Sequence, residues 1–266
     1  MSAITIREMT GDDEYFVGTC SHVHESQEYD ACAGRRVAWL RATYDRGVRA
    51  LVALLDGEHA GFAYVMPIEV DPWGPLGRDL AVLNCLWVIE PARHAGVGHA
   101  LVAATEDEAR RQQQKALVAP AYYHDFWFMP AVFFEACGFV LAVQREQRAL
   151  LWKVYDPSAE PPTFLEPCYK HEAAPGQVTI DLFWNPCCAT SDGEAQRVRE
   201  VAAEFGSRVV LREFDAGDRA VLLKYQRPRG IFVNGTEIGW GYQAPREGLR
   251  AAIQAALDKL SANREG

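Results

Sequence analysis

The sequence lacks several features that would place a protein in a class at once. No apolar run approaches the roughly 18 residues of a membrane-spanning helix, and the N-terminus lacks the basic-then-apolar pattern of a secretory leader. The 266 residues include 27 lysines and arginines against 36 acidic residues, so the formal net charge is −9. No basic stretch offsets this balance, and we expect neither a nucleic-acid partner nor a membrane partner.

The sequence also lacks a disulfide framework. It has seven cysteines, an odd number, whereas a disulfide-rich secreted domain carries an even set at regular spacing. They are scattered along the chain at Cys20, Cys32, Cys85, Cys137, Cys168, Cys187 and Cys188. We therefore expect a cytoplasmic protein with reduced thiols.

What the sequence does contain is enough apolar material for two globular domains. Hydrophobic residues make up 49% and charged residues 24%, as in ordinary soluble proteins, and one domain takes about 150 residues. Prolines cluster between Asp156 and Thr163, which is typical of a linker. We predict a first domain at residues 1–156, a linker at 157–176 and a second domain at 177–266.

The most informative stretch runs from Leu86 to Leu101. It begins as an apolar strand, breaks at Pro91, passes through a turn containing Gly96 and Gly98, and continues as an alanine-rich helix. Such a turn leaves backbone N–H groups unpaired in front of the positive end of the helix dipole, which suits a pyrophosphate. The alternative is an ordinary strand-turn-helix corner, because two-glycine turns are common.

The spacing of the glycines distinguishes between phosphate sites. The G-x-G-x-x-G of a dinucleotide fold and the Lys-Ser/Thr ending of a P-loop are both absent. The order present is R-x-x-G-x-G from Arg93 to Gly98, which together with Val88 resembles the acetyl-CoA signature of the GNAT acetyltransferases. The run from Val132 to Phe139 resembles the F-Y-E-x-x-G-F of that family's last helix.

The order of the expected elements agrees with this resemblance over roughly residues 3–155. We expect strands at 4–7, 48–55, 60–66, 80–89, 116–119, 139–143 and 149–154, with a loop at 71–77 and helices within 12–47 and at 98–113 and 130–136. The resemblance implies an α+β fold with a mixed central sheet flanked by helices. It also implies acetyl-CoA as the co-substrate.

The second domain has a different pattern. Strands are expected at 178–184, 209–214, 230–233 and 237–239, and helices near 194–205, 219–225 and 245–260. This order resembles a smaller, thioredoxin-like α/β domain, and the run from Arg229 to Gly239 resembles the I-F-I-N-G-x-x-I-G hairpin of glutaredoxins. The combination of the two domains resembles the YoaP-like family of acetyltransferases.

The resemblance assigns the cofactor to three parts of the first domain. The turn would hold the pyrophosphate, and the central strand would splay from its neighbour so that free N–H groups pair with pantetheine and polarise the thioester. The last helix would lie over the pantetheine arm. The cofactor-binding candidates are Trp87, Val88, Arg93, His94, Ala95, Gly96, Val97, Gly98, His99 and Phe134.

The proton carriers depart from the family pattern. Many members carry a tyrosine acid at the position of Phe134, and a phenyl ring cannot donate a proton. A frequent glutamate base on the central strand is not evident, since Val82, Leu83 and Asn84 stand there. A thiol is already fairly acidic and water can relay the amine proton, so transfer is still expected.

Replacement groups stand in loops that would flank the acceptor. His124 is the candidate base, because imidazole titrates near neutrality; the alternative is a solvated histidine beside a helix cap at Asp125. The other catalytic candidates are Tyr123, Asn84 and Cys188. The substrate-binding candidates are Tyr122, His22, His24, Glu25 and Glu28. We expect no metal site, because a helical i, i+2 spacing would point the two rings of His22 and His24 apart.

In the second domain, Cys188-Ala-Thr-Ser191 stands where thioredoxin-like proteins carry C-x-x-C. A helix N-terminus stabilises a thiolate, but the serine leaves no resolving thiol, and a disulfide to the adjacent Cys187 would be strained. Arg229 replaces the family's cis-proline and would lie near the thiol. An idle cysteine pair, a reactive monothiol and a soft-metal or metalloid site all stay open.

These patterns favour an acetyl-CoA-dependent N-acetyltransferase that acts on a small-molecule amine and carries a thioredoxin-like appendage. The alternative is a catalytically weak coenzyme A-binding protein whose second domain senses thiols, soft metals or metalloids. A thiol oxidoreductase is disfavoured by the missing second cysteine. The acidic stretch from His22 to Glu28 suggests a cationic acceptor, or else a solvated face.

Overall fold

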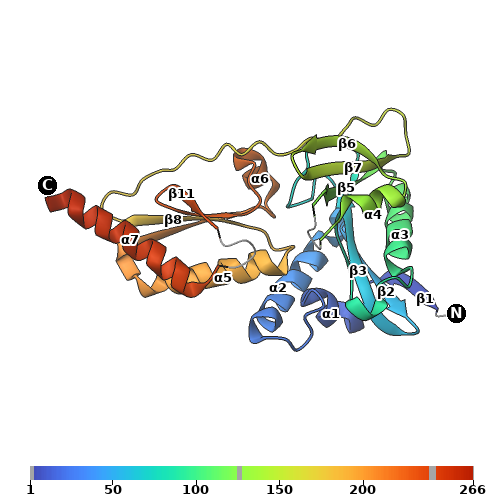
Figure 1. Ribbon diagram of the computed structural model, residues 1–266, viewed down its shortest axis with the longest axis horizontal. Helices are drawn as coiled ribbons and strands as arrows, with labels where there is room; N and C mark the ends of the chain where they lie inside the picture. The colour runs from blue at the N-terminus through green and yellow to red at the C-terminus, as the bar shows by residue number, and fades with distance from the viewer. Residues whose placement is uncertain (1–2, 125–127, 240–243, 266) are drawn as a thin grey trace. The chain divides into compact units, whose positions relative to one another are not determined.

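The computed structural model describes residues 3–124, 128–239 and 244–265. The chain divides into two compact units, Met1–Leu165 and Glu166–Gly266, each with its own apolar core (Figure 1). The predicted linker at 157–176 falls across this division. Thr163 forms a bridge with Leu76 in the first unit, whereas the backbone N–H of Cys168 donates to the carbonyl of Tyr225 in the second.

The described residues of the first unit form a sheet in the order β1-β2-β3-β4-β5-β7-β6. Its strands are β1 Ile4–Glu8, β2 Arg49–Leu55, β3 Glu58–Pro67, β4 Ala81–Val88, β5 Ala116–Tyr122, β6 Val140–Arg145 and β7 Arg148–Val154. Its helices are α1 Glu14–Gly18, α2 Gln27–Thr43, α3 Val97–Arg111 and α4 Ala131–Ala136. The predicted strands and main helices are confirmed, and β5 is longer than the expected 116–119.

Local chemistry explains the start of this sheet. Asp56 and Gly57 have φ angles of 53° and 92°, which is the left-handed backbone that a tight hairpin between β2 and β3 requires. Strands β1 to β4 are antiparallel, and among the described strands of this sheet the one parallel pair joins β4 to β5. A parallel pair needs a crossover, and α3 supplies it.

The two faces of the sheet are covered by different helices (Figure 1). Helix α3 buries Leu101 and Val102 against sheet residues that include Ala63. On the other face, the Phe16 ring of α1 packs edge-on against Phe62 at 6.0 Å. The guanidinium of Arg36, from α2, donates to the hydroxyl of Tyr64 at 2.8 Å. Residues 62 and 64 therefore face α1 and α2, whereas Ala63 faces α3, as strand alternation requires.

A buried carboxylate ties the start of α1 to the sheet. The Asp13 side chain is 0% exposed and accepts hydrogen bonds from Arg7 Nη2 at 2.9 Å, the backbone N–H of Thr10 at 2.7 Å and His59 Nε2 at 2.8 Å. Burial alone would raise the pKa of Asp13, but these hydrogen bonds outweigh it and hold the pKa well below its usual range.

The second unit is a smaller sheet in the order β11-β10-β8-β9. Its elements are β8 Val178–Trp184, α5 Ala189–Glu204, β9 Val209–Asp215, α6 Arg219–Tyr225, β10 Gly230–Val233, β11 Thr236–Ile238 and α7 Arg246–Glu265. Strands β8 and β9 are parallel, and β10 is antiparallel to both β8 and β11. The predicted elements are confirmed, although α5 begins at Ala189 rather than near residue 194.

The two faces of this smaller sheet differ. One face packs the aliphatic side chains of Ile180 and Leu182 against α5 and α7 residues. The other face carries an aromatic cluster, with the ring of Tyr169 4.7 Å from Phe232. Beside it the fully buried Asp181 is paired with Arg212, whose Nη2 donates to Asp181 Oδ2 at 2.8 Å. Burial raises the pKa of Asp181, but the hydrogen bonds from Arg212 and Tyr169 lower it overall.

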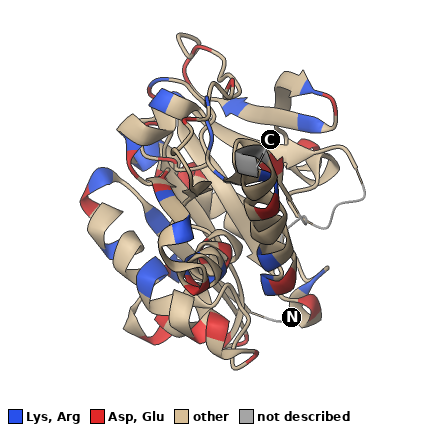
Figure 2. Ribbon diagram, turned by 90° about the vertical axis from the view of Figure 1, so that its left-hand side faces the viewer, with Lys and Arg blue, Asp and Glu red and all other residues tan. Residues whose placement is uncertain are grey.

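Surface charge is mixed in sign. Figure 2 shows acidic and basic residues interspersed along the helices rather than gathered by sign. None of the helices in the described part of the chain combines the length and apolar character needed to cross a bilayer.

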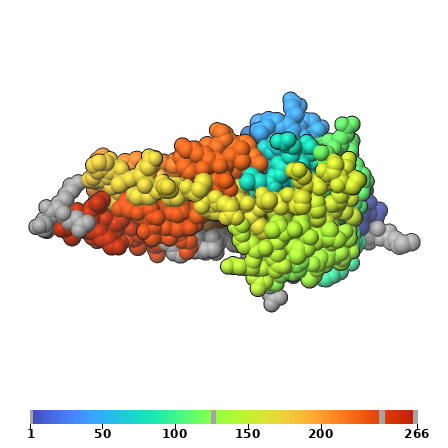
Figure 3. Space-filling model, turned by 90° about the horizontal axis from the view of Figure 1, so that it is seen from above, coloured from blue at the N-terminus to red at the C-terminus, as the bar shows by residue number. Residues whose placement is uncertain are grey.

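Figure 3 shows the green-to-yellow atoms of β6, β7 and the following segment at the surface of the first unit. Val140 and Leu141 of the edge strand β6 are exposed apolar residues.

Candidate functional site

The separation of β4 from β5 creates an open strand edge within the sheet. Strand β4 pairs with β3 from Ala81 to Val88, but it pairs with β5 only at Ala81 and Val82. Strand β5 then continues beside β7 as far as Tyr122. Beyond Val82, the edge of β4 that faces β5 therefore has no strand partner among the described residues. The splay that the sequence resemblance implied is present.

A β-bulge accompanies this separation. Tyr64 pairs with Cys85 and Val65 pairs with Leu83, so Asn84 is an extra residue in β4. Leu83 before the bulge and Leu86 after it both pack into the core cluster that includes α3. A regular strand would place them on opposite faces. The bulge thus shifts the side-chain alternation by one residue at the point where the strands separate.

The turn between β4 and α3 presents backbone donors. Gly96 is the N-cap of α3, with φ 88°, and no side chain caps the helix. His94 is also left-handed, with φ 63°, a conformation that costs a non-glycine residue energy and tends to persist at functional sites. Among the described residues, no hydrogen bond uses the backbone N–H groups of residues 94–99. The first turn of α3 contains no acidic residue that would neutralise its positive end.

The side chains beside this turn differ in part from the prediction. Arg93 folds back on β4, with its guanidinium carbon 5.4 Å from the centre of the Trp87 ring. Phe134, expected along the cofactor arm, is 0% exposed and packs in the core against Phe139. Its neighbour Phe133 is the ring that reaches the start of α3, since a Cβ added at Gly98 would lie 3.1 Å from Phe133 Cζ. Of the other candidates here, Val97 is buried and His99 is exposed.

The loop after β5 holds the next group of candidates. The backbone N–H of Tyr122 donates to Met129, and its ring lies 5.3 Å from that of His124. The Tyr123 hydroxyl donates to Glu135 Oε1 at 2.5 Å. This hydrogen bond, followed by burial, raises the pKa of Tyr123. Asp125, the expected helix cap, lies outside the described residues.

The segment between α1 and α2 corrects a prediction. His22 and His24 were expected at helical spacing, but they lie in an irregular turn with Glu25, because His24 has a left-handed φ of 57°. His22 Nδ1 lies 2.5 Å from Glu25 Oε2. His24 Nδ1 is 3.1 Å from the Tyr15 hydroxyl. Glu28, also expected at the acceptor, is in the first turn of α2. No group of three or more metal-ligating side chains occurs in the described ranges.

Sequence reasoning missed Asp71. This carboxylate is 0% exposed, and its Oδ1 accepts hydrogen bonds from the backbone N–H of Trp73 at 3.1 Å and from Asn84 Nδ2 at 2.9 Å. The first contact closes an Asx-turn. The Asp-Pro-Trp-Gly sequence predicts such a turn, but nothing local indicates that the carboxylate meets β4.

In the second unit, Cys188 is the N-cap residue of α5. Its Sγ lies 3.1 Å from Thr190 Oγ1, and Arg229 Nη1 donates to the same hydroxyl at 3.3 Å. Arg229 also pairs with Glu194 through Nε at 2.7 Å. Arg229, the arginine expected near the thiol, is therefore connected to Cys188 through the Thr190 hydroxyl. Cys187 is buried.

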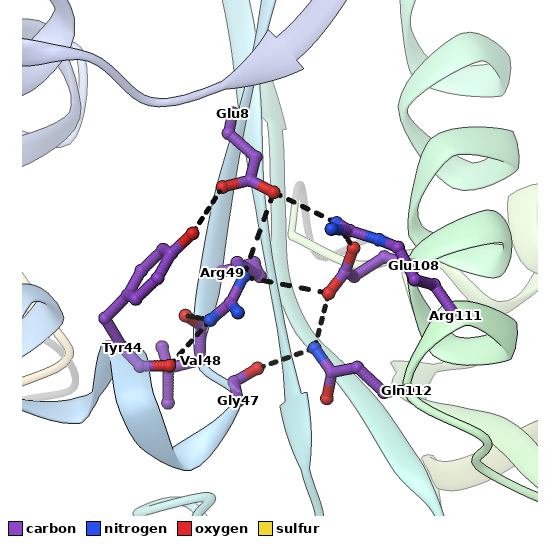
Figure 4. Close-up of polar contacts among 8 residues, drawn as sticks. All are labelled: Glu8, Tyr44, Gly47, Val48, Arg49, Glu108, Arg111 and Gln112. Atoms are coloured by element: carbon purple, nitrogen blue, oxygen red, sulfur yellow. Dashed lines mark hydrogen bonds and ion pairs between the residues drawn. The ribbon is translucent and has the colours of Figure 1, made fainter.

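A cavity of about 330 Å³ lies elsewhere in the first unit, lined by the end of β1, the end of α2 and the start of β2. Glu8 lines this cavity, and Figure 4 shows its carboxylate between two donors, Tyr44 OH and Arg111 Nη2, each 3.0 Å from a carboxylate oxygen. Burial would raise the pKa of Glu8, but these partners lower it overall. The network ties β1 to the C-terminal end of α3. Ile4, at the other end of β1, is the residue that reaches Gly96.

Comparison with known proteins locates the resemblance in the first unit. Residues 12–139 match the model of the acetyltransferase (GNAT) family. A comparison with curated proteins finds no match.

Solved structures of three acetyltransferase-related proteins are similar to part of the chain. A GNAT-family protein from Desulfovibrio desulfuricans is 20% identical, covering 57% of this chain and 99% of its own, with a TM-score of 0.44. The yncA protein from Salmonella typhimurium, solved with its cofactor acetyl-CoA, is 19% identical, covering 60% and 98%, with a TM-score of 0.44. The paiA N-acetyltransferase from Thermoplasma acidophilum, solved in complex with coenzyme A, is 14% identical, covering 57% and 99%, with a TM-score of 0.40.

Proposed function

We propose that the first unit, a GNAT acetyltransferase domain by its family match, transfers the acetyl group of acetyl-CoA to the amine of a small molecule in the cytoplasm. The amine nitrogen attacks the thioester carbonyl carbon, a C–N bond forms and the C–S bond breaks. Coenzyme A leaves as the thiol, taking up the equivalent of the proton that the amine gives up. The observation that carries this proposal is the open edge of β4 leading into the uncapped start of α3.

The residues of this edge and turn fit the two ends of coenzyme A. The N–H groups of residues 94–99 stand at the positive end of a 15-residue helix without a competing carboxylate, which favours a diphosphate. The backbone of Trp87 and Val88 lies on the edge of β4 that no described strand of the β5 side covers, where the amides of pantetheine can bind as a strand does. An N–H at that edge can also stabilise the oxyanion of the tetrahedral intermediate.

The loop after β5 supplies the proton carriers in this proposal. His124 takes the amine proton, directly or through water. Tyr123 gives a proton to the leaving thiolate. A tyrosine hydroxyl holds its proton at neutral pH, as a donor must, and the hydrogen bond to Glu135 that raises the pKa of Tyr123 has to break before this proton can reach the thiolate.

The turn between α1 and α2 forms the acceptor side of the proposed site. His22, His24 and Glu25 project from it, with Glu28 in the helix that follows, and Tyr122 closes the opposite side. The concentration of carboxylates favours a cationic amine, which must lose one proton before it can attack.

The cofactor assignment is tested at His99, an exposed residue in the first turn of α3. His99→Glu adds an acid where the helix dipole favours it, so stability should rise by about 0.3–1 kcal/mol. The same charge repels a diphosphate, so coenzyme A affinity measured by calorimetry should fall at least about tenfold. His99→Gln is the neutral control. An unchanged affinity in His99→Glu contradicts the assignment, and the rise in stability excludes misfolding as a cause of weaker binding.

The activity itself is tested by release of free coenzyme A in the presence of primary amines of different charge. Acceptor-dependent thiol release that saturates with the amine supports the transferase. Tight coenzyme A binding with no release above hydrolysis favours the alternative, a coenzyme A-binding protein without turnover.

A second function concerns the thiol of the second unit. We propose that this unit is thioredoxin-like, on the support of the β8-α5-β9 crossover and the antiparallel β10-β11 hairpin, and that Cys188 is a reactive monothiol for sensing thiols or soft metals. Its place at the N-cap of a 16-residue helix and the shared Thr190 hydroxyl support this. Cys188 should therefore be alkylated by iodoacetamide faster at neutral pH than Cys168, an exposed thiol outside any helix. Equal rates, followed by mass spectrometry, would contradict a reactive Cys188.

A further inference from the structure

We propose that Asn84 binds the attacking amine and that Asp71 positions Asn84 for this role. The inference rests on the proposed acetyl transfer and adds to it the residue that holds the acceptor nitrogen. The pair joins a loop carboxylate to the bulge of β4, through the 2.9 Å hydrogen bond from Asn84 Nδ2 to Asp71 Oδ1.

The bulge determines which way Asn84 faces. Leu83 and Leu86 belong to the α3 side of the sheet, and Asn84 contacts Asp71 and the Met66 sulfur on the opposite side. That opposite face is the one covered by α1 and α2, where Phe62 and Tyr64 pack. The extra residue therefore points a polar side chain toward the proposed acceptor side, two residues after the last pairing with β5.

The orientation of the Asn84 amide is fixed by its neighbours. Its nitrogen lies between the Asp71 carboxylate and Met66 Sδ, at 2.9 and 3.6 Å, and both of these atoms are acceptors. A flipped amide would place its carbonyl oxygen against the carboxylate, which is repulsive. Asp71 is itself held by the backbone N–H of Trp73 and is fully buried. Its carboxylate therefore keeps a fixed position and holds the Asn84 amide in one orientation.

The fixed amide defines the chemistry that Asn84 offers. Asn84 is itself buried, with 6% of its surface exposed, and its carbonyl oxygen, an acceptor, lies on the other branch of the amide from the nitrogen that Asp71 holds. Such an oxygen can accept an N–H of a neutral primary amine and so direct the nitrogen lone pair at the thioester carbon. An amide does not take up the amine proton, so Asn84 binds the nucleophile while another group or water acts as the base. Asp71 acts only through Asn84 and is a positioning residue.

The test uses hydroxylamine as the acceptor, because this small amine does not depend on the shape of the natural substrate. Asn84→Leu keeps the branched shape of the side chain, with somewhat larger methyl groups, and removes both polar atoms. We expect its kcat/KM for hydroxylamine to fall at least about 30-fold, with coenzyme A affinity within about twofold because the cofactor turn is untouched. Met66→Leu, which removes the weaker sulfur contact, is the matched control and should retain activity within about threefold.

Two Asp71 variants separate positioning from proton transfer. In Asp71→Asn, the amide oxygen can still accept from Trp73 and Asn84, so activity should stay within about threefold and the pH profile should not change. Asp71→Leu should lose about tenfold in kcat in the wild-type background and nothing further in the Asn84→Leu background. If Asp71→Leu fails to fold, the Asp71→Asn result alone decides its role.

Each contrary outcome has a distinct meaning. Asn84→Leu activity within threefold of wild type overturns the role of Asn84. An Asp71→Asn variant as inactive as Asn84→Leu, with a shifted pH profile, makes Asp71 the base and overturns its positioning role. A wild-type protein that binds coenzyme A but acetylates no amine, hydroxylamine included, overturns this inference and leaves cofactor binding intact. Failure to bind coenzyme A removes the proposed function itself.

Discussion

Gly61 is the residue whose replacement tests the open strand edge most directly. It lies in β3 and pairs with Val88 at the end of β4. A Cβ at this position would overlap the carbonyl oxygen of Trp87 and lie 3.2 Å from Val88 Cα. Both obstacles are backbone atoms, so no side-chain rotation can relieve them. Gly61→Ala must therefore push the end of β4 away from β3.

The cost can be worked out from these contacts. The methyl group also meets Leu101 Cδ1 of α3 at 3.4 Å, so it cannot move toward that helix. Overpacking of this kind costs about 1–3 kcal/mol, which lowers the Tm of a unit of this size by about 2–12 °C. The displaced backbone of Trp87 and Val88 should lose one or two hydrogen bonds to pantetheine, each worth about 1 kcal/mol or about fivefold in affinity.

The assay combines scanning calorimetry with coenzyme A titration at a temperature where the variant is folded. Gly34→Ala is the control, because a Cβ there would have no atom within 4 Å apart from its chain neighbours and the nearby backbone of its own helix. Its position inside α2 should make it neutral or stabilising by up to about 1 kcal/mol. A Gly61→Ala protein that melts within about 1 °C of wild type would refute the steric reasoning. A lowered Tm with unchanged affinity would show that the backbone at Trp87 and Val88 is not part of the cofactor site.

Three further predictions concern charged and titratable groups. Folding lowers the pKa of Asp13, so its contribution to stability is fully present above about pH 5 and is lost as the pH falls below about 4. Asp13→Asn should therefore lower the Tm at pH 7 and make the Tm fall less steeply between pH 7 and pH 3. Wild-type and variant plots of Tm against pH that run parallel would contradict this. In the second unit, Arg212→Met removes the guanidinium that pairs with the buried Asp181 and should lower the free energy of unfolding, measured in urea, by about 3 kcal/mol. Arg199→Met, whose partner is partly exposed, should lower it by less than about 1 kcal/mol. Equal losses would argue against burial as the cause. His124→Ala should lower kcat at pH 7 by about 100-fold with unchanged coenzyme A affinity, and full turnover would remove His124 from the mechanism.

The elements that the sequence predicted well are those set by local chemistry. The path from Leu86 to Leu101 depends on an apolar strand, a proline and two glycines in one continuous stretch, and the structure follows it. The Asp56-Gly57 turn likewise depends on two adjacent residues with left-handed backbones. In the second unit, alternating apolar residues placed every strand within about two residues.

The parts that the sequence did not predict depend on distant partners. The bulge at Asn84 exists only in the register of β4 against β3, so no pattern within β4 indicates it. Asp71 meets Asn84 across 13 positions of chain that contain an irregular loop. Phe133 and Phe134 are adjacent in a six-residue helix, and only the packing of that helix decides which ring is enclosed. The turn at His22 and His24 departs from helical spacing because His24 and its neighbours Cys20 and Ser21 adopt left-handed backbones.

The one-residue phase shift in β4 makes this strand tolerant of some genetic changes and intolerant of others. Replacing Asn84 exchanges a single side chain and leaves every other residue on its own side of the sheet. Deleting Asn84 would put Cys85 directly after Leu83 and restore regular alternation, with Leu86 and Val88 still on the α3 side of the sheet. Deleting Leu86 instead would leave the bulge in place, turn Trp87 into the α3 core and turn Val88 out of it. A codon deletion at Asn84 should therefore be much less harmful than a codon deletion at Leu86.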